Sequence, residues 1–263
     1  MAARIVGIAL LVILVVGAEF VAVPEARLIR RDDSASGVVT GGGDGESAAG
    51  ARRPSKWNRG GVISVAGIDT TSKAIEWAMA ELIKNPREMV KVQTEVRQVA
   101  GAQGVLKEHL GTMSRLHAAM KEAMRLHPPV PLLLPHEAIQ DTKLHGYDIP
   151  VKTWVMINAW PIGRDNETWE NAEELLPEKF MHSPIDYNGK DFRFIPFSAG
   201  RRGCPGIVFA TRLAELALAN LMYHFDWELT EGQDLESFQV VESTGLTPAL
   251  NPALILVAKP LEA

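Results

Sequence analysis

The sequence predicts a mainly α fold with a minor β region, because helical periodicity dominates it and strand-like runs are short. Apolar residues recur at helical spacing over four stretches, 62–83, 86–100, 112–126 and 207–223. Alternating and β-branched residues fill three shorter runs, 132–139, 144–149 and 153–158, with turns expected at Asp141 and Gly146. Of the 263 residues, 46% are hydrophobic and 22% charged, an ordinary globular balance that allows a sizeable core.

The first helix is expected to end at Asn85-Pro86, which also begins the second helix, and the third to end before Pro128-Pro129. The strand-like runs follow the third helix. The fourth helix follows a glycine-rich loop and leads to a strand containing Phe225, Trp227 and Leu229. These elements form the folded region, 62–263.

The N-terminal 61 residues have a different character. The unbroken apolar run 5–18, with its heavier basic cluster on the C-terminal side, predicts an anchor within 1–31 that places the body on the cytoplasmic face of the endoplasmic reticulum membrane. The run is short for a membrane span, and Val16 and Ala18 suit a signal-peptidase site, so a cleaved secretory signal is the alternative. Residues 32–61, rich in Gly and Ser, are expected to be a disordered linker.

Charge and cysteine content narrow the function classes. The formal net charge of −5 gives no general attraction to nucleic acid, so no nucleic-acid partner is expected. A single cysteine excludes an intramolecular disulfide and is consistent with reducing surroundings. Any soft ligand that the chain offers must therefore act alone.

That cysteine, Cys204, lies in a turn just before the fourth predicted helix. Gly200 and Gly203 allow the backbone to turn tightly and approach a flat ligand. The free N–H groups at a helix N-terminus favour a thiolate, which could ligate haem iron, while Arg201 or Arg202 could pair with a haem carboxylate. A lone cysteine is more often a small buried hydrophobe, and a cysteine nucleophile acting with one of seven histidines is a further alternative.

The residues around Cys204 favour the haem interpretation. Five of them stand at fixed offsets that resemble the haem-binding loop of the cytochrome P450 family: Phe197, Gly200, Arg202, Cys204 and Gly206. The resemblance implies haem b as cofactor, Cys204 as the axial ligand of its iron, and Phe197 packed against the sulfur. It covers the chain from about Val62 to Pro260, with details similar to the plant microsomal members.

A second resemblance lies near the start of the first helix. The run 66–71, with a glycine and adjacent threonines, has low helix propensity. It resembles the oxygen-activating segment of the family, which implies that Asp69 is the acid and Thr70 the hydroxyl donor of a proton relay. The alternative is a helix cap.

A third resemblance concerns charged residues. Glu122 and Arg125 stand at i,i+3 and share one helix face, where a surface ion pair is the ordinary interpretation. Followed by Leu126-His127-Pro128-Pro129, they match the family's Glu-x-x-Arg signature, which implies a buried structural pair. The family's Pro-Glu-Arg-Phe signature has Lys179 in place of its arginine, and lysine cannot pair bidentately, so a weaker network is expected.

The remaining site predictions also follow from the resemblance. His136 stands where plant members carry an arginine that reaches a haem propionate, and a histidine is a weaker, pH-dependent partner. Val130 and Leu133, with their neighbours Leu132 and Leu134, are expected to contact substrate, with core packing as an equal alternative. Leu246 belongs to the turn of a C-terminal hairpin that closes the substrate pocket, with 254–257 as the expected return strand.

Together these resemblances imply a haem-thiolate monooxygenase. It would insert one oxygen atom from O2 into a small hydrophobic specialised metabolite, with electrons from NADPH-cytochrome P450 reductase on the same membrane. Full members are about twice as long as this chain, so an incomplete cytochrome P450 fold is expected. The rival hypothesis is a truncated, non-catalytic relative that at most binds haem.

Overall fold

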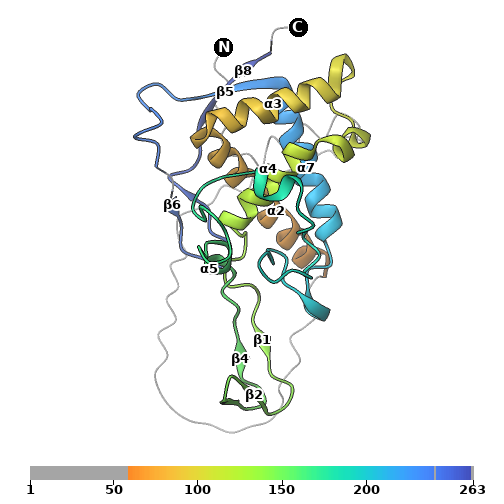
Figure 1. Cartoon of the computed structure of the whole chain (residues 1–263), viewed down its shortest axis with the longest axis vertical. Coiled ribbons are helices and arrows are strands. Elements are labelled where there is room, and N and C mark those ends of the chain that lie inside the picture. The colour runs from red at the N-terminus through yellow and green to blue at the C-terminus, as the bar shows by residue number, and fades with distance from the viewer. Residues whose placement is uncertain (1–58, 240, 262–263) are drawn as a thin grey trace.

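Four long helices form the body of the molecule (Figure 1). The computed structural model describes residues 59–239 and 241–261, with side chains from Ala66 onward. The long helices are α2 (Arg59–Lys84), α3 (Pro86–Ala100), α4 (Ser114–Leu126) and α7 (Ile207–His224). Each of the four packs against the other three, so together they form one bundle.

The ends of these helices agree with the stop signals in the sequence. Asn85 ends α2 by donating its side-chain amide to the carbonyl of Glu81, and Pro86 occupies the first turn of α3, where a missing N–H costs nothing. Helix α4 stops at Leu126, directly before His127 and its following prolines. Helix α2 begins at Arg59, three residues before the expected start, and its weak segment 66–71 is helical because the rest of the helix is anchored in the core.

Short helical segments connect the long helices. Two of them lie between α3 and α4, and three lie between α4 and α7. They are η1 (Gly101–Gln103), η2 (Lys107–Thr112), α5 (Ala159–Gly163), α6 (Glu178–Met181) and η3 (Gly200–Arg202).

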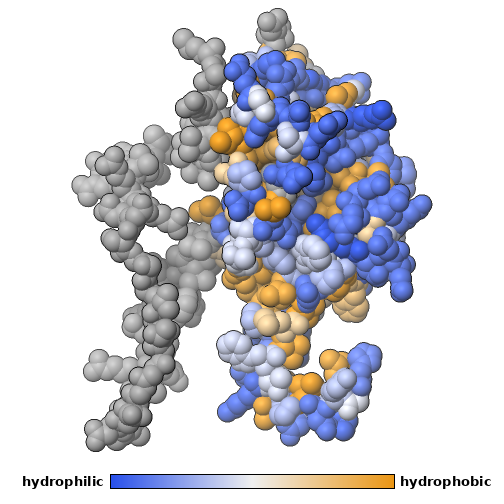
Figure 2. Space-filling model, turned by 90° about the vertical axis from the view of Figure 1, so that its left-hand side faces the viewer, coloured by the Kyte–Doolittle hydropathy of each residue, from blue (hydrophilic) through white to orange (hydrophobic). Residues whose placement is uncertain are grey.

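The central strands form an arm that projects from the helical body (Figures 1 and 2). Two antiparallel pairs build it, β1 (His136–Glu137) with β4 (Trp154–Val155) and β2 (Thr142–Leu144) with β3 (Tyr147–Ile149). The expected strands 132–139, 144–149 and 153–158 were wrong in their bounds: the first and third are two residues long, and the second is interrupted by the His145-Gly146 turn. The turn at Gly146 itself is confirmed, and its φ of +87° suits glycine.

Two further antiparallel pairs involve the C-terminal residues. Strand β5 (Phe225–Leu229) pairs with β8 (Leu256–Pro260), and β6 (Val241–Glu242) pairs with β7 (Leu250–Asn251). The return strand of the C-terminal hairpin was predicted at 254–257, and this position was wrong. The strand that pairs with β6 is β7, and the residues from Leu256 onward form β8, which pairs with β5. The predicted strand containing Phe225, Trp227 and Leu229 is confirmed.

The core lies between the long helices. Many of the fully buried side chains come from α2, α4 and α7, among them Ile75, Met79, Leu82, Leu116, Met120, Leu218 and Met222. A mainly α fold with a minor β region is thus confirmed. Among residues 59–239 and 241–261, no helix has both the length and the apolar character that a membrane crossing needs. The predicted anchor within 1–31 and almost all of the predicted linker 32–61 lie outside the described residues.

Candidate functional site

The loop 197–206 holds Cys204 in a compact turn before α7. The Cys204 N–H donates to the carbonyl of Phe197 at 2.9 Å, and the Gly203 N–H donates to the carbonyl of Gly200 at 3.1 Å. Gly200 has a φ of +73°, a conformation that glycine adopts without steric cost. Phe197 is half-buried and meets the ring of Tyr187 edge-on. The turn thus ties the two ends of the predicted motif together.

The Cys204 sulfur is exposed and faces a backbone donor. The Gly206 N–H lies 3.4 Å from Sγ, and α7 begins at the next residue, Ile207. A Cβ added to Gly206 would stand 3.8 Å from Sγ, so a side chain there would cover part of the sulfur. The buried-hydrophobe interpretation of Cys204 does not hold here. Among the described residues no histidine hydrogen-bonds to Sγ, so the structure adds nothing to the cysteine-nucleophile alternative.

Cationic and apolar side chains flank the exposed sulfur in sequence. Arg201 and Arg202 are exposed, and within the described part of the chain neither forms an ion pair. In the first turn of α7, Val208 and Phe209 are 75% and 73% exposed, which is unusual for two adjacent large apolar residues. Among the described residues, the loop and the first turn of α7 therefore combine a soft donor, two cations without an ion-pair partner and exposed apolar surface.

Asp69 and Thr70 lie in α2, but they make separate contacts. The Thr70 hydroxyl donates to the carbonyl of Ala66 at 2.6 Å, within the helix. Asp69 Oδ2 instead accepts a hydrogen bond from the hydroxyl of Thr247, at 2.5 Å, in the C-terminal hairpin. Sequence reasoning missed this contact, because the two residues are 178 positions apart and no local pattern connects them.

Glu122 and Arg125 form a fully buried ion pair. Both side chains are 0% exposed, and Arg125 donates Nε and Nη2 to the two carboxylate oxygens of Glu122 at 2.6 and 2.8 Å. Arg125 also donates to the carbonyls of Gly163, Ala172 and Glu174. Every polar face of the pair thus has a partner, which is the condition for burying charges at tolerable cost.

Lys179 completes this network by a geometry unlike that of arginine. Its ammonium donates to Glu122 Oε1 at 3.1 Å and to the carbonyls of Asn171 and Glu174 at 2.9 and 3.2 Å. Burial lowers the pKa of Lys179 and outweighs the opposing effect of Glu122. Because all three ammonium protons have acceptors, lysine satisfies this position without bidentate pairing.

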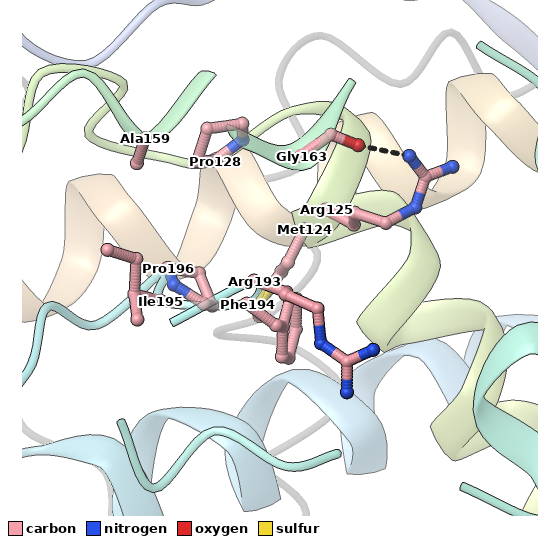
Figure 3. Close-up of a pocket in the computed structure, with 9 residues that line it drawn as sticks. All are labelled: Met124, Arg125, Pro128, Ala159, Gly163, Arg193, Phe194, Ile195 and Pro196. Carbon is pink, nitrogen blue, oxygen red and sulfur yellow. Dashed lines mark hydrogen bonds between the residues drawn. The ribbon is translucent and has the colours of Figure 1, made fainter. Parts of the chain in front are cut away.

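A small pocket lies beside this network, and Cys204 is not among the residues that line it (Figure 3). It is lined by the end of α4, by α5 and by residues 193–196, and the Arg125 guanidinium points away from it toward the Gly163 carbonyl. A Cβ on Gly163 would stand 2.2 Å from the Arg125 carbonyl oxygen, so only glycine fits there. Gly163 thus allows α5 to approach α4 closely.

The predicted substrate contacts differ in exposure. Leu133 is buried with Ala159 and Ile195, as core packing requires, and Val130 is half-buried. Leu246 is 60% exposed at the tip of the C-terminal hairpin, and apolar residues gather where the arm joins the body (Figure 2). His136 is half-buried in β1, opposite Val155. The roles of these residues stay predictions.

A buried polar cluster that the sequence did not indicate joins α2, α4 and β6. The His127 ring stacks on Trp77 at 3.7 Å and bridges Glu81 and Glu242, with N–O distances of 3.2 and 2.7 Å. Burial by itself raises the pKa of both carboxyl groups. The hydrogen bonds and charge of His127, helped by Lys84 at Glu81, outweigh burial, so the pKa of each carboxyl lies below its ordinary value.

Comparison with known proteins decides the family. The family model described as Cytochrome P450 matches residues 60–254. The chain belongs to the cytochrome P450 family. It is 51% identical to cytochrome P450 71A1 of Persea americana over 194 residues, 73% of this chain. It is 48% identical to psoralen synthase of Ammi majus and 45% identical to costunolide synthase of Cichorium intybus, over 74% and 73% of this chain.

The cytochrome P450 family is a family of haem-thiolate monooxygenases. The chain spans about two fifths of the length of these relatives, 39%, 40% and 39% respectively. The residues present fit a haem at the Cys204 loop. The sulfur is uncovered, Gly206 leaves it open, and Arg201 and Arg202 are free to pair with carboxylates.

Proposed function

We propose that this chain binds haem b through the Cys204 thiolate and works as a monooxygenase on small hydrophobic specialised metabolites. The exposed Cys204 sulfur, which faces the Gly206 N–H in front of α7, is the observation that carries the proposal. When bound, the haem supplies dioxygen activation, and a thiolate ligand favours cleavage of the O–O bond.

The chain's own residues have distinct roles in this proposal. Cys204 provides the ligand, and Arg202 pairs with a haem carboxylate. Gly200 and Gly206 keep the loop tight and the sulfur accessible, while Phe197 would pack against the face of the sulfur once it ligates iron. On α2, Asp69 would take up a proton from solvent on its carboxylate, and Thr70 would pass it toward dioxygen after its hydroxyl turns away from the Ala66 carbonyl.

Other residues would bind substrate or support the site. Leu246, exposed at the hairpin tip, and the half-buried Val130 before the arm contribute apolar contacts to the substrate. Leu133, buried with Ala159 and Ile195, supports this region from the core, and His136 is a second partner for a haem carboxylate. Glu122, Arg125 and Lys179 hold the α4 end and the stretch after α5 in place, since their network links these segments. They take no part in the chemistry.

The names of the relatives support the proposed substrate class. Their names include psoralen synthase and costunolide synthase, both plant proteins. NADPH-cytochrome P450 reductase is the proposed electron donor, and the apolar run 5–18 is the proposed anchor on the endoplasmic reticulum membrane. Residues 1–31, 32–61 and 62–263 are accordingly proposed as anchor, linker and haem-binding region.

One observation favours a second candidate, a relative that binds haem without catalysis. Val208 and Phe209 beside the loop are largely exposed, so the surface next to Cys204 is open to water. Water that reached a bound haem would divert electrons from substrate oxidation. In this case the chain would hold haem at Cys204 but would not couple NADPH consumption to product.

Incorporation of labelled oxygen separates the two candidates. The membrane-bound chain would be combined with the reductase, NADPH and 18O2, and a panel of small hydrophobic plant metabolites would be screened for labelled products. A monooxygenase yields product carrying one 18O atom, and Cys204→Ser yields none. Haem that stays bound and is reduced by the reductase, with no labelled product across the panel, would instead support the non-catalytic candidate.

A further inference from the structure

The C-terminal hairpin is fastened along α2. Trp77 and Glu81 stand four residues apart on one face of the helix, and Asp69 lies two turns before Trp77, about 80° around the helix axis from it. Trp77 donates its indole N–H to the buried carbonyl of Pro248 at 3.4 Å. Glu81 is linked to β6 through the ring of His127. The contacts of Trp77 and Glu81 therefore hold the hairpin against α2 independently of Asp69.

The loop of this hairpin is also closed upon itself. The Ser243 N–H donates to the carbonyl of Ala249 at 2.9 Å, and the Ala249 N–H donates back to the Ser243 hydroxyl at 2.9 Å. Leu250, which follows, is buried with Trp77 and Ala80. With both ends of the loop fixed, the side chain of Thr247 has a defined position next to α2.

Thr247 uses that position to contact Asp69. Its hydroxyl donates to Asp69 Oδ2, while the hydroxyl of Thr70, the immediate neighbour of Asp69, is occupied by the Ala66 carbonyl. We propose that Thr247 is a positioning residue that fixes the orientation of the Asp69 carboxylate and thereby aims the acid of the proton relay. This inference rests on the proposed function for the role of Asp69, whereas the contact itself does not.

The physical reason is the freedom of a half-exposed aspartate. A hydrogen bond to a charged group is stronger than one between neutral groups, so it selects one orientation of the carboxylate among several. An acid delivers a proton only when it lies within hydrogen-bond reach of the acceptor. A carboxyl group that rotates freely therefore transfers protons less efficiently, even though the group itself is unchanged. The hydroxyl of Thr247 is therefore the group whose removal tests the proposal, and a serine at this position retains a hydroxyl.

The test compares Thr247→Val, which keeps the shape, with Thr247→Ser, which keeps the hydroxyl. The first measurement is the carboxyl 13C resonance of Asp69 in the full chain, assigned by its loss in Asp69→Asn. Thr247→Val should move this resonance, and Thr247→Ser should leave it near its original position. An unmoved resonance in Thr247→Val, or an equal shift in both variants, would overturn the inference.

A double-mutant cycle on unfolding gives an independent measure of the contact. Thr247→Val should raise the unfolding equilibrium constant about tenfold when Asp69 is present, and much less in an Asp69→Asn background. Equal effects in the two backgrounds would mean that Thr247 acts on the hairpin alone, which contradicts the proposed positioning role.

Haem-loaded protein tests the consequence for the relay. Thr247→Val should increase about tenfold the peroxide released per product formed, and Thr247→Ser should reverse this. An unchanged ratio in Thr247→Val would show that the contact is structural only. If the chain binds no haem, the proposed function fails, while the resonance and the cycle still decide whether Thr247 holds Asp69.

Discussion

Loss of charge at Glu122 should be among the most destabilising single substitutions in this chain. Four hydrogen bonds converge on its carboxylate, two from Arg125 at 2.6 and 2.8 Å, one from the Leu176 N–H at 3.0 Å and one from Lys179 at 3.1 Å. Glu122→Gln preserves the shape but leaves the guanidinium of Arg125, 0% exposed, without its counter-charge. Breaking a buried pair in this way costs about 3–5 kcal/mol.

Urea unfolding followed by circular dichroism measures this loss, read as a lower midpoint at an unchanged slope. The matched control is Asp148→Asn, which breaks the Lys143–Asp148 pair on the exposed arm, where the side chains are 71% and 79% exposed. That change should cost less than about 1 kcal/mol. A loss below about 1 kcal/mol for Glu122→Gln, or an equal loss for the control, would refute the structural role of the network.

Two further predictions concern packing and pH. Gly163→Ala should destabilise the chain by about 1–3 kcal/mol, because the new Cβ meets the Arg125 carbonyl at 2.2 Å, whereas Gly67→Ala in α2, with nothing within 4 Å, should not destabilise it. Thermal unfolding of both variants checks this, and equal shifts would contradict it. Burial opposes protonation of His117, but its bond to Glu215 more than compensates and raises its pKa. The stability that His117 contributes is therefore fully present below about pH 6.5 and is lost as the pH rises through the raised folded-state pKa. His117→Gln should accordingly lose more stability at pH 6 than at pH 9, and a pH-independent loss would count against the pair.

The helices could be predicted from the sequence because their signals are local. Periodic apolar residues and the prolines at Pro86 and Pro128 fix where the long helices begin or end, and the structure agrees within a few residues. The strands were less predictable. Strand β8 depends on β5, roughly thirty residues earlier, and β1 and β2 are too short for alternation to define their ends.

The candidate site shows the same division. The Glu122–Arg125 pair follows from i,i+3 spacing within one helix, and the structure contains it. The hydrogen bonds of Lys179 could not be predicted, because two of their acceptors are backbone carbonyls of a loop whose path the sequence does not specify. The Asp69–Thr247 contact depends on how the C-terminal hairpin meets α2, which only the tertiary structure determines.

The most direct test of the central claim is the absorption spectrum of the purified full chain, reduced and then exposed to carbon monoxide. Haem held by the Cys204 thiolate predicts a strongly red-shifted Soret band, which Cys204→Ser abolishes without a change in circular dichroism. A protein that folds but binds no haem would contradict the claim. So would a band at the position of histidine- or thiol-bound haem, or one that persists in Cys204→Ser.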